Sequence, residues 1–290
     1  MKLLITGVGG FLGNHLTSLF CQSGKHTIHA IYNKKKPENF KKSVKLIKSN
    51  VSKLNISGHY NFVIHCASKT RVNNENNKNL YYDNVISIKQ ILKKISFDKF
   101  FFMSSNSVYG NITQTKINEY TRLNANDFYA RSKIKCEQIL QRYSKKNQNK
   151  IFVFRLPAVV GVKSHSNFIS NLMNSYKCHN FDTIKINNKN DLFNNTIHAE
   201  EIYKFIKNLL FNKKTKRYNL FVLGSKSPIK LTKILSICDR FFNKKISHHY
   251  VVSKIHNKLV DFSKSLKYGF KPIKTSNTIL KMLKENCVKK

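Results

Sequence analysis

The feature that most constrains this chain is a glycine-rich turn close to its N-terminus. The segment Thr6-Gly7-Val8-Gly9-Gly10-Phe11-Leu12-Gly13 follows a short apolar run and opens an amphipathic segment. Glycines at positions 7, 10 and 13 let the backbone turn tightly, approach a pyrophosphate closely and pack the helix on the sheet. The G-x-x-G-x-x-G spacing predicts a dinucleotide-binding turn between a strand and a helix, and a purely structural glycine turn is the alternative.

Short apolar runs alternate with longer amphipathic segments through the first half of the chain. The predicted helices span residues 14–21, 84–94 and 130–143, and the predicted strands span residues 3–6, 27–32, 44–47, 62–66, 100–104 and 151–156. This alternation is typical of βαβ units on a parallel sheet. We therefore expect an α/β fold, a doubly wound parallel sheet of the Rossmann type, with its ligand sites at the carboxyl ends of the strands.

The alternation loosens in the second half of the chain. A strand at 218–223 lies between helical patterns at 200–210 and 231–242, and the polar stretch 185–195 precedes them. We interpret this half as a smaller lobe that closes over the edge of the sheet. The predicted organisation is a dinucleotide-binding Rossmann domain at residues 1–157 and a C-terminal substrate lobe at residues 158–290. Within the lobe, about residues 196–216 are expected to pack back on the Rossmann domain.

The chain is strongly basic, with a formal net charge of +39, and such a charge alone favours a nucleic-acid partner. The cations are nearly all lysines, because only seven of the 53 basic residues are arginines, at positions 71, 122, 131, 142, 155, 217 and 240. Nucleic-acid readers depend on arginine for bidentate contacts, and the sequence carries no helix-turn-helix, zinc-finger or aromatic RNA-binding pattern. We therefore predict no nucleic-acid partner and interpret the lysines as a solvated surface.

Cysteine spacing and the apolar runs limit the class of protein further. The six cysteines lie far apart, without a C-x-x-C pair or a histidine at metal-ligand spacing, which predicts reduced thiols and no metal site. Gly7, Gly9 and Gly10 interrupt the apolar start, so we expect no signal peptide. No run approaches the roughly 18 apolar residues of a membrane span. The predicted location is the cytoplasm.

The second predicted strand ends in Tyr32-Asn33-Lys34-Lys35-Lys36. A turn that binds NAD usually carries an acidic residue here to hold the ribose hydroxyls, whereas basic residues suit the 2′-phosphate of NADP. Lysine runs occur throughout the chain, so a solvated run without a ligand is the alternative. We favour NADP over NAD as the cofactor.

A tyrosine and a lysine one helical turn apart give the strongest chemical signal. Tyr129 and Lys133 lie in Tyr129-Ala130-Arg131-Ser132-Lys133 at the start of a predicted helix, so they share one face. A free phenol has a pKa of about 10 and is a poor base near neutrality, and an adjacent cation stabilises its phenolate. Ser105 follows the strand at 100–104 and can hydrogen-bond the same substrate oxygen. Together these residues predict a proton-transferring site at the carboxyl edge of the sheet.

With these motifs the chain resembles the extended short-chain dehydrogenases/reductases, the NAD-dependent epimerase/dehydratase family to which UDP-galactose 4-epimerase belongs. The resemblance covers nearly the whole chain and includes residues 62–68, 81–85, 154–161, 197–201, 218–219 and 261–272. It implies an enzyme with a nicotinamide cofactor that acts on a nucleotide-linked sugar.

The resemblance also implies a role for individual residues. Tyr129 would be the acid/base, Lys133 would stabilise its phenolate and hold the ribose, and Ser105 would orient the reacting oxygen. Hydride would pass between the substrate carbon and the nicotinamide. The residues expected to bind NADP or NAD are Gly7, Gly10, Phe11, Leu12, Gly13, Asn33, Lys34, Asn50, Val51, Cys66, Ala67, Ser68, Asn84, Tyr129, Lys133 and Pro157.

Three places depart from the family pattern. Asn106 and Ser107 stand where the sugar 4,6-dehydratases carry an Asp-Glu pair, so elimination of water lacks an evident acid/base pair. Asn50 and Val51 replace an aspartate that contacts adenine, and Asn194 occupies the place of an arginine that often binds the substrate diphosphate. These departures argue against dehydration and weaken the expected contacts with adenine and with the diphosphate.

The favoured function is NAD(P)-dependent reduction of a 4-keto sugar nucleotide, with Tyr129 as the acid/base. A nucleotide-sugar C4 epimerase that retains NAD is the first alternative. A non-enzymatic sensor of NADP on the same fold is the alternative from a different class. The expected partner is a nucleotide-sugar substrate, with no membrane partner, and a homodimer is left open.

Overall fold

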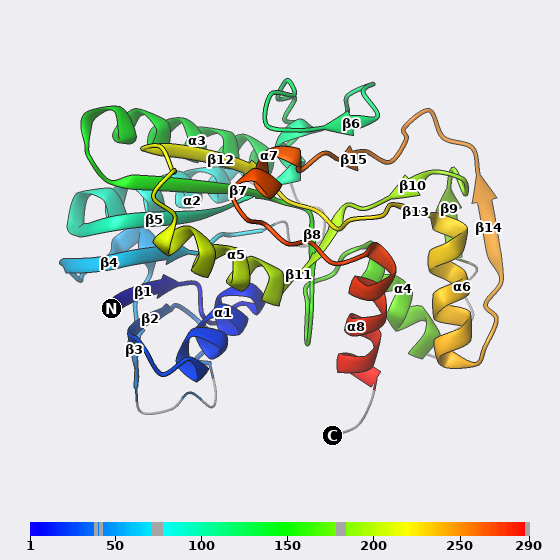
Figure 1. The fold of residues 1–290 in the computed structure, drawn as a ribbon, viewed down its shortest axis with the longest axis horizontal. Coiled ribbons are helices and arrows are strands. Elements are labelled where there is room, and N and C mark those ends of the chain that lie inside the picture. The colour runs from blue at the N-terminus through cyan, green and yellow to red at the C-terminus, as the bar shows by residue number, and fades with distance from the viewer. Residues whose placement is uncertain (38–39, 41–42, 71–77, 178–183, 288–290) are drawn as a thin grey trace.

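The computed structural model describes the 290-residue chain except residues 38–39, 41–42, 71–77, 178–183 and 288–290. Its centre is a seven-stranded sheet in the order β12-β7-β5-β4-β1-β2-β3, in which all neighbouring strands are parallel (Figure 1). These strands are β1 (Lys2–Thr6), β2 (Thr27–Tyr32), β3 (Val44–Lys48), β4 (Gly58–His65), β5 (Ile95–Ser105), β7 (Lys150–Leu156) and β12 (Tyr218–Val222). The strand order reverses between β1 and β4, which is where a doubly wound sheet opens a crevice for ligands. The predicted fold class is confirmed.

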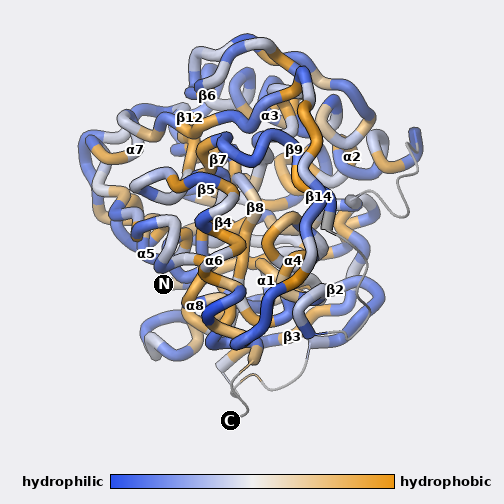
Figure 2. Tube along the Cα trace, turned by 90° about the vertical axis from the view of Figure 1, so that its right-hand side faces the viewer, coloured by the Kyte–Doolittle hydropathy of each residue, from blue (hydrophilic) through white to orange (hydrophobic). Residues whose placement is uncertain are grey.

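Apolar side chains hold these strands in the middle of the molecule. Leu3, Leu4 and Ile5 of β1 have no exposed surface, and Phe100 and Phe101 of β5 have none either. A parallel sheet that is covered on both faces requires such continuous apolar runs. Figure 2 shows the same pattern, with hydrophobic residues along the central strands and hydrophilic residues on the outer loops.

Two pairs of helices cover the two faces of the sheet. On one face Leu16 and Phe205 share an apolar cluster with Ile5, and on the other face Leu140 shares a cluster with Val63. Figure 1 shows the first pair side by side. The first pair is α1 (Phe11–Gln22) and α5 (Ala199–Phe211), and the second pair is α2 (Lys78–Lys94) and α3 (Phe128–Lys146).

The remaining elements are short strand pairs and helices that lie mostly to one side of the sheet. The pairs are β8 (Ala158–Val160) with β11 (Thr196–His198), β9 (Ile184–Asn187) with β14 (His248–Val251), β10 (Leu192–Phe193) with β13 (Ile229–Lys230), and β6 (Lys116–Ile117) with β15 (Leu259–Val260). The helices are α4 (Phe168–Lys177), α6 (Leu231–Phe242), α7 (Ser263–Lys267), α8 (Thr275–Cys287) and the 3-10 helices η1 (Val51–Lys53) and η2 (Asn106–Tyr109). An apolar cluster with Ile169, Ile234 and Met282 joins α4, α6 and α8. Within the described part of the chain, no helix is long and apolar enough to cross a membrane.

Most predicted elements are present, with ends displaced by a few residues. β2 and α6 have the predicted bounds, whereas α2 begins at Lys78 rather than at Asn84. The sequence patterns do not predict α4 or α8, and the polar stretch 185–195 contains β10 and most of β9. The predicted division after residue 157 remains a prediction. β12, from the second half, completes the central sheet, and α5 lies beside α1 on its face.

Candidate active site

The turn between β1 and α1 has room only for glycine at three positions, one of which is Gly9, where a Cβ would lie 2.4 Å from the carbonyl oxygen of Lys35. Gly7 has a φ of +76°, and a Cβ on it would lie 2.5 Å from the backbone nitrogen of Ala67. A Cβ on Gly13 would lie 2.3 Å from the carbonyl oxygen of Gly7. The turn therefore brings the start of α1, with its unpaired N–H groups, against the loop that follows β4.

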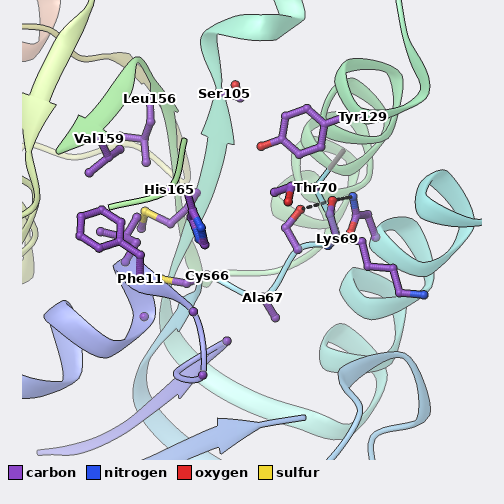
Figure 3. A pocket seen from close by; sticks show the side chains of 18 of the residues that line it. Phe11, Cys66, Ala67, Lys69, Thr70, Ser105, Tyr129, Leu156, Val159 and His165 are labelled. Carbon is purple, nitrogen blue, oxygen red and sulfur yellow. Dashed lines mark hydrogen bonds between the residues drawn. The ribbon is translucent and has the colours of Figure 1, made fainter. Parts of the chain in front are cut away.

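A cavity of about 580 Å³ opens at this turn, at the carboxyl edge of the sheet (Figure 3). We call it the first cavity. All sixteen residues that the sequence analysis assigns to the cofactor line it, together with Ser105. The structure thus brings together Gly7, Gly10, Phe11, Leu12, Gly13, Asn33, Lys34, Asn50, Val51, Cys66, Ala67, Ser68, Asn84, Tyr129, Lys133 and Pro157. Their individual roles remain predictions.

Tyr129 and Lys133 lie in the first turns of α3, on the side that faces the first cavity. Asp127 caps this helix by accepting a hydrogen bond of 2.8 Å from the backbone nitrogen of Ala130. The Lys133 Nζ lies 5.5 Å from the centre of the Tyr129 ring and donates a hydrogen bond of 2.8 Å to the carbonyl oxygen of Met103. Figure 3 shows the Tyr129 hydroxyl directed into the cavity. The helix start therefore presents a phenol with a buried ammonium beside it.

Ser105 is the last residue of β5, and Figure 3 shows it on the side of the Tyr129 ring that faces away from α3. Its Oγ accepts hydrogen bonds from the backbone nitrogen of Ser107 at 3.1 Å and from the Ser107 hydroxyl at 3.0 Å. Accepting two hydrogen bonds leaves the Ser105 hydroxyl proton available as a donor. Ser105 lines the first cavity and also a second one, so an oxygen bound between the two cavities can reach it.

Asn84 connects three segments beneath the first cavity. Its Oδ1 accepts from the backbone nitrogen of Lys69 at 2.8 Å, and its Nδ2 donates to the Lys69 carbonyl at 3.1 Å and to the Ser132 Oγ at 3.0 Å. The side chain thereby joins α2, α3 and the loop after β4. Because its donors and acceptor already have protein partners, Asn84 holds the shape of the cavity floor.

A buried ion pair lies below the active-site helix. The Arg155 guanidinium of β7 contacts Glu137 of α3 at 2.7 Å, and the Ser104 hydroxyl donates to the same carboxylate at 2.5 Å. Arg155 also donates to the Tyr109 hydroxyl at 3.1 Å. Burial alone would lower the pKa of Arg155, but its hydrogen bonds and charge interaction with Glu137 raise this pKa above the ordinary value. The pair links α3 to β7 and, through Ser104, to β5, the strand that ends at Ser105.

Two titratable groups at the end of β4 carry no charge at neutral pH. Burial lowers the pKa of His65 to about 3 and raises the pKa of the Cys66 thiol to about 12, with the Lys133 charge as the second influence on both. His65 is hydrogen-bonded through Nδ1 to the Thr6 Oγ1 at 2.7 Å. Among the described charged groups close to the Tyr129 ring, Lys133 therefore supplies the positive charge.

Part of the first cavity was not predicted. The additional lining residues are Gly9, Lys35, Lys69, Thr70, Asp83, Ser87, Met103, Ser104, Leu156, Ala158, Val159, His165, Ser166 and Asn167. Most of them adjoin predicted residues in the sequence. A separate wall of the cavity is formed by His165, Ser166 and Asn167. The sequence signal for this wall was an asparagine before an amphipathic helix. Asn167 caps that helix, α4, by accepting hydrogen bonds from the backbone nitrogens of Ile169 and Ser170.

A second cavity, of about 630 Å³, meets the first at Ser105, Leu156, Pro157 and Ala158. Its other walls carry amides, one carboxylate and one ammonium, from Asn106, Asn111, Asn126, Asn195, Asp127 and Lys258 among others. Asn106 donates from Nδ2 to the Asn195 Oδ1 at 3.0 Å.

The neighbouring Asn194 lines neither cavity. It is buried, and its amide forms hydrogen bonds of 2.9 and 2.8 Å with the backbone of Val260. Asn194 therefore holds the segment of β15 in place and does not substitute for a ligand-binding arginine.

A glycine turn at a switch point, a Tyr–Lys helix and a serine at the adjacent strand end define a dinucleotide enzyme of the short-chain dehydrogenase type. A profile of the NAD dependent epimerase/dehydratase family matches residues 3–220. The chain belongs to this family. The predicted resemblance to the extended short-chain dehydrogenases is thereby confirmed, and so is the prediction of an enzyme of this type.

Known relatives agree with this assignment. A dTDP-D-glucose 4,6-dehydratase of Dictyostelium discoideum is 26% identical over 213 residues, which are 61% of this chain and 49% of that protein. The match thus spans about half the length of that relative. UDP-glucuronic acid 4-epimerase from Bacillus cereus, solved with UDP-glucuronic acid and NAD, superposes with a TM-score of 0.83 over 98% of each chain at 18% identity. UDP-glucose 4-epimerase from Bifidobacterium longum, solved with NAD+ and UDP, gives 0.75 over 98% of this chain and 97% of that one, also at 18% identity. At this identity the two structures establish the shared fold.

Proposed function

We propose that the chain binds a nicotinamide dinucleotide in the first cavity and oxidises or reduces a nucleotide-linked sugar that lies in the second. The observation that carries this proposal is the convergence of the glycine turn, Ser105, Tyr129 and Lys133 on one crevice at the carboxyl edge of the sheet. Such an edge is where doubly wound folds bind their ligands.

The residues present fit a dinucleotide. Gly7 and Gly13 allow the turn to pack closely on its own neighbours, and Gly10 lines the first cavity without a side chain, so a pyrophosphate could approach the backbone at the start of α1. Asn33, Lys34, Asn50 and Val51 would hold the adenosine half, and Tyr129, Lys133 and Pro157 the nicotinamide half. The cofactor, when bound, supplies the acceptor or donor of hydride.

The chain's own residues would handle the proton. During oxidation of the sugar, the Tyr129 phenolate would take the proton of the reacting hydroxyl as hydride leaves the same carbon. During reduction, the Tyr129 hydroxyl would return that proton to the carbonyl oxygen. Lys133 would stabilise the phenolate through its positive charge, and the Ser105 hydroxyl, held by Ser107, would hydrogen-bond the reacting oxygen.

Two reactions are compatible with this site. Reduction of a 4-keto sugar nucleotide needs one hydride transfer and an exchanging cofactor, whereas C4 epimerisation needs oxidation and then return of hydride to the opposite face with a retained cofactor. Epimerisation is supported at least as well, since structural neighbours include two UDP-sugar 4-epimerases solved with NAD. Asn106 and Ser107, which follow Ser105, offer an amide and a hydroxyl in place of ionisable groups, so dehydration is not favoured.

The end of β2 supports NADP as the cofactor. Lys34 and Lys35 line the first cavity there beside Asn33. The one carboxylate among the described lining residues, Asp83, is paired with Lys69. A 2′-phosphate would therefore meet positive charge and no unpaired carboxylate at this end. The family description names NAD, so the choice between the two remains part of the proposal.

Replacing Tyr129 with Phe tests the catalytic proposal. We expect hydride transfer between the cofactor and a UDP-sugar or its 4-keto form, followed by nicotinamide absorbance, to fall at least about 100-fold, because Tyr129 is the group proposed to take or return the proton. Tyr143→Phe, on the same helix but outside both cavities, is the matched control and should keep full activity. Unchanged turnover in Tyr129→Phe would overturn the role of Tyr129 as the acid/base, whereas cofactor binding without any turnover in the wild type would favour a cofactor sensor.

The spectrum of the purified protein separates the two reactions. Stoichiometric nicotinamide that survives purification supports the epimerase, and its absence, together with turnover on added reduced cofactor, supports the reductase. Thermal shifts with NAD and with NADP compare the two cofactors directly, since preferential binding registers as added stability.

A further inference from the structure

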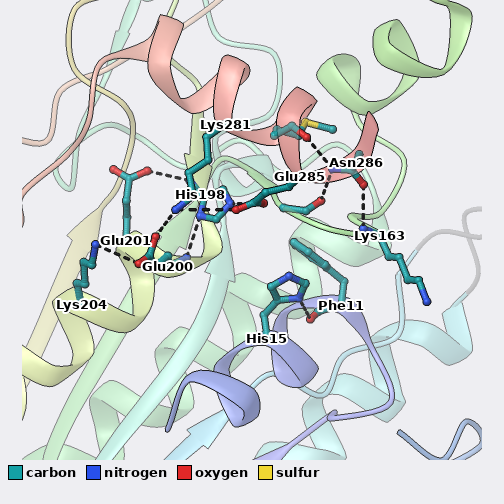
Figure 4. Close-up of polar contacts among 12 residues, drawn as sticks. Phe11, His15, Lys163, His198, Glu200, Glu201, Lys204, Lys281, Glu285 and Asn286 are labelled. Atoms are coloured by element: carbon teal, nitrogen blue, oxygen red, sulfur yellow. Dashed lines mark hydrogen bonds and ion pairs between the residues drawn. The ribbon is translucent and has the colours of Figure 1, made fainter. Parts of the chain in front are cut away.

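The last turn of α8 reaches across to the loop that follows β8 (Figure 4). Asn286 donates from Nδ2 to the Gly161 carbonyl at 3.3 Å and accepts on Oδ1 from the backbone nitrogen of Lys163 at 3.2 Å. Its Nδ2 also donates to the Met282 carbonyl in its own helix at 2.8 Å. The side-chain amide of Asn286 therefore forms hydrogen bonds with two residues of a turn that lies more than 100 residues earlier in the chain.

That turn contains a residue in an unfavourable conformation. Lys163 has a φ of +58°, in the left-handed region that non-glycine residues rarely adopt. Such a residue persists where the surrounding structure holds it, and the hydrogen bond from its backbone nitrogen to Asn286 is such a restraint. The turn has little space to relax inward, because a Cβ on Gly161 would lie 3.2 Å from the Phe11 ring.

The turn leads directly into a wall of the first cavity. His165, Ser166 and Asn167 line the cavity two to four residues after Lys163. The His165 ring meets the edge of the Phe11 ring at a centroid distance of 6.1 Å, and Phe11 opens α1 and lines the same cavity. A shift of the turn would therefore displace side chains on two sides of the cavity.

The end of α8 is itself held in place. Glu285 accepts from His198 Nε2 at 2.9 Å, and the Lys177 Nζ of α4 donates to the Asn286 carbonyl at 2.8 Å. His198 Nδ1 accepts from the backbone nitrogen of Glu200, so the ring proton lies on Nε2 and points at Glu285. Asn286 is thus presented to the turn by a helix end with two independent anchors.

We infer that Asn286 is a positioning residue for cofactor binding: it holds the Gly161–Lys163 turn in its strained form and thereby the His165–Asn167 wall in the shape that accepts a dinucleotide. The inference rests on the proposed function, since it requires that the first cavity binds a dinucleotide. It assigns a role to α8, which lies beyond residues 3–220 that the family profile matches. Asn286 does not line the cavity and acts only through the turn.

The test compares dinucleotide affinity in Asn286→Ala and in the full wild-type chain, by calorimetry with NAD and NADP well below the unfolding temperature. We expect the Kd of Asn286→Ala to rise about tenfold, the size that fits loss of support for one strained residue. Asn277→Ala, an exposed asparagine on the same helix, is the matched control and should change the Kd less than about twofold. An unchanged Kd in Asn286→Ala would overturn the inference.

Two further measurements separate positioning from a general loss of structure. UDP binding, attributed to the second cavity, should stay within about twofold in Asn286→Ala, and an equal loss of UDP and dinucleotide affinity would count against the inference. Lys163→Gly in the Asn286→Ala background should recover most of the lost affinity, because glycine adopts a φ of +58° without cost. If Lys163→Gly did not restore the dinucleotide affinity, the inference would also be overturned. If the wild type binds neither dinucleotide, the proposed function itself fails.

Discussion

The central sheet and the short strand pairs and helices beside it, which we call the lobe, hold their residues in place by different means. In the sheet half, Gly7, Ser105 and Tyr129 are placed by the ends of strands and the start of a helix, so their positions follow from backbone pairing. In the lobe, Asn194 and Asn286 make the decisive contacts across 66 and 125 residues through single amides. Residues at the ends of paired strands are held by many backbone hydrogen bonds. Residues held by one side-chain amide from a distant part of the chain can be displaced by a single substitution.

The contrast is largest for side chains that contact a carboxylate. Arg155→Met should lower the free energy of unfolding by about 4 kcal/mol, because Glu137 would remain buried and uncompensated. His256→Ala in the lobe removes a pair with Asp191 from a side chain that is 57% exposed, and should cost less than about 1 kcal/mol. Urea denaturation measures both values, and equal costs would break the contrast.

The double variant Arg155→Met with Glu137→Met sharpens this result. It removes both members of the ion pair and so leaves no uncompensated carboxylate at position 137, and it should therefore be more stable than Arg155→Met alone. A double variant that is as unstable as the single one would mean that packing around the pair, and not the orphaned carboxylate, sets the cost.

Acid should weaken the sheet half through His65. The folded pKa of about 3 lies below the unfolded value of 6.5, so the unfolded chain binds the extra proton between these values. The contribution of His65 is therefore complete above pH 6.5 and is lost as pH falls towards 3. Between pH 6.5 and 4.5 the wild type should lose about 2 kcal/mol more than His65→Asn, which keeps an acceptor near the Thr6 hydroxyl. Parallel pH profiles for the two proteins would refute this assignment.

In the lobe, Asn194→Ala should cost about 2 kcal/mol, because it leaves the buried backbone N–H and carbonyl of Val260 without partners. Asn194 lines neither cavity, so the dinucleotide Kd should be unchanged within about twofold when it is measured below the unfolding temperature. A large loss of affinity would show that the two halves are coupled at this point.

The smallest effect concerns the choice of cofactor. Replacing Lys34 and Lys35 together by Ala should weaken NADP binding about tenfold, by roughly 1.4 kcal/mol, and leave NAD within about twofold. Lys36→Ala, an exposed neighbour outside the first cavity, is the control. Equal losses for both cofactors would assign the lysines to the shared phosphates and not to the 2′-phosphate.

The fold could be predicted where the pattern is local. Residues 27–32 form an apolar run between polar residues, and β2 has those bounds. α4 carried a usable signal that was missed, since Ile169, Leu172, Met173 and Tyr176 recur at helical spacing and are buried. β9 and β10 gave no such signal, because strands of four and two residues depend on partners far along the chain.

The candidate site could likewise be predicted where a local sequence pattern places its residues, and not where contacts distant in sequence do. The assigned residues line one cavity because a glycine turn and two strand ends must meet at the edge of a parallel sheet. Lys69 and Thr70 could have been added by continuing past Ser68. The Asn167 cap was a local signal for the helix that follows the His165 wall, but the place of that wall beside the cavity could not be predicted, since no local pattern connects it to Asn286.

The position of β12 has a consequence for synthesis of the protein. β7 is an edge strand until residues 218–222 pair with it, so a nascent chain emerging from the ribosome exposes the unpaired backbone of β7 over the time needed to translate more than sixty further residues. We expect chaperone dependence during translation to end when β12 emerges, and premature termination before it to give aggregating products.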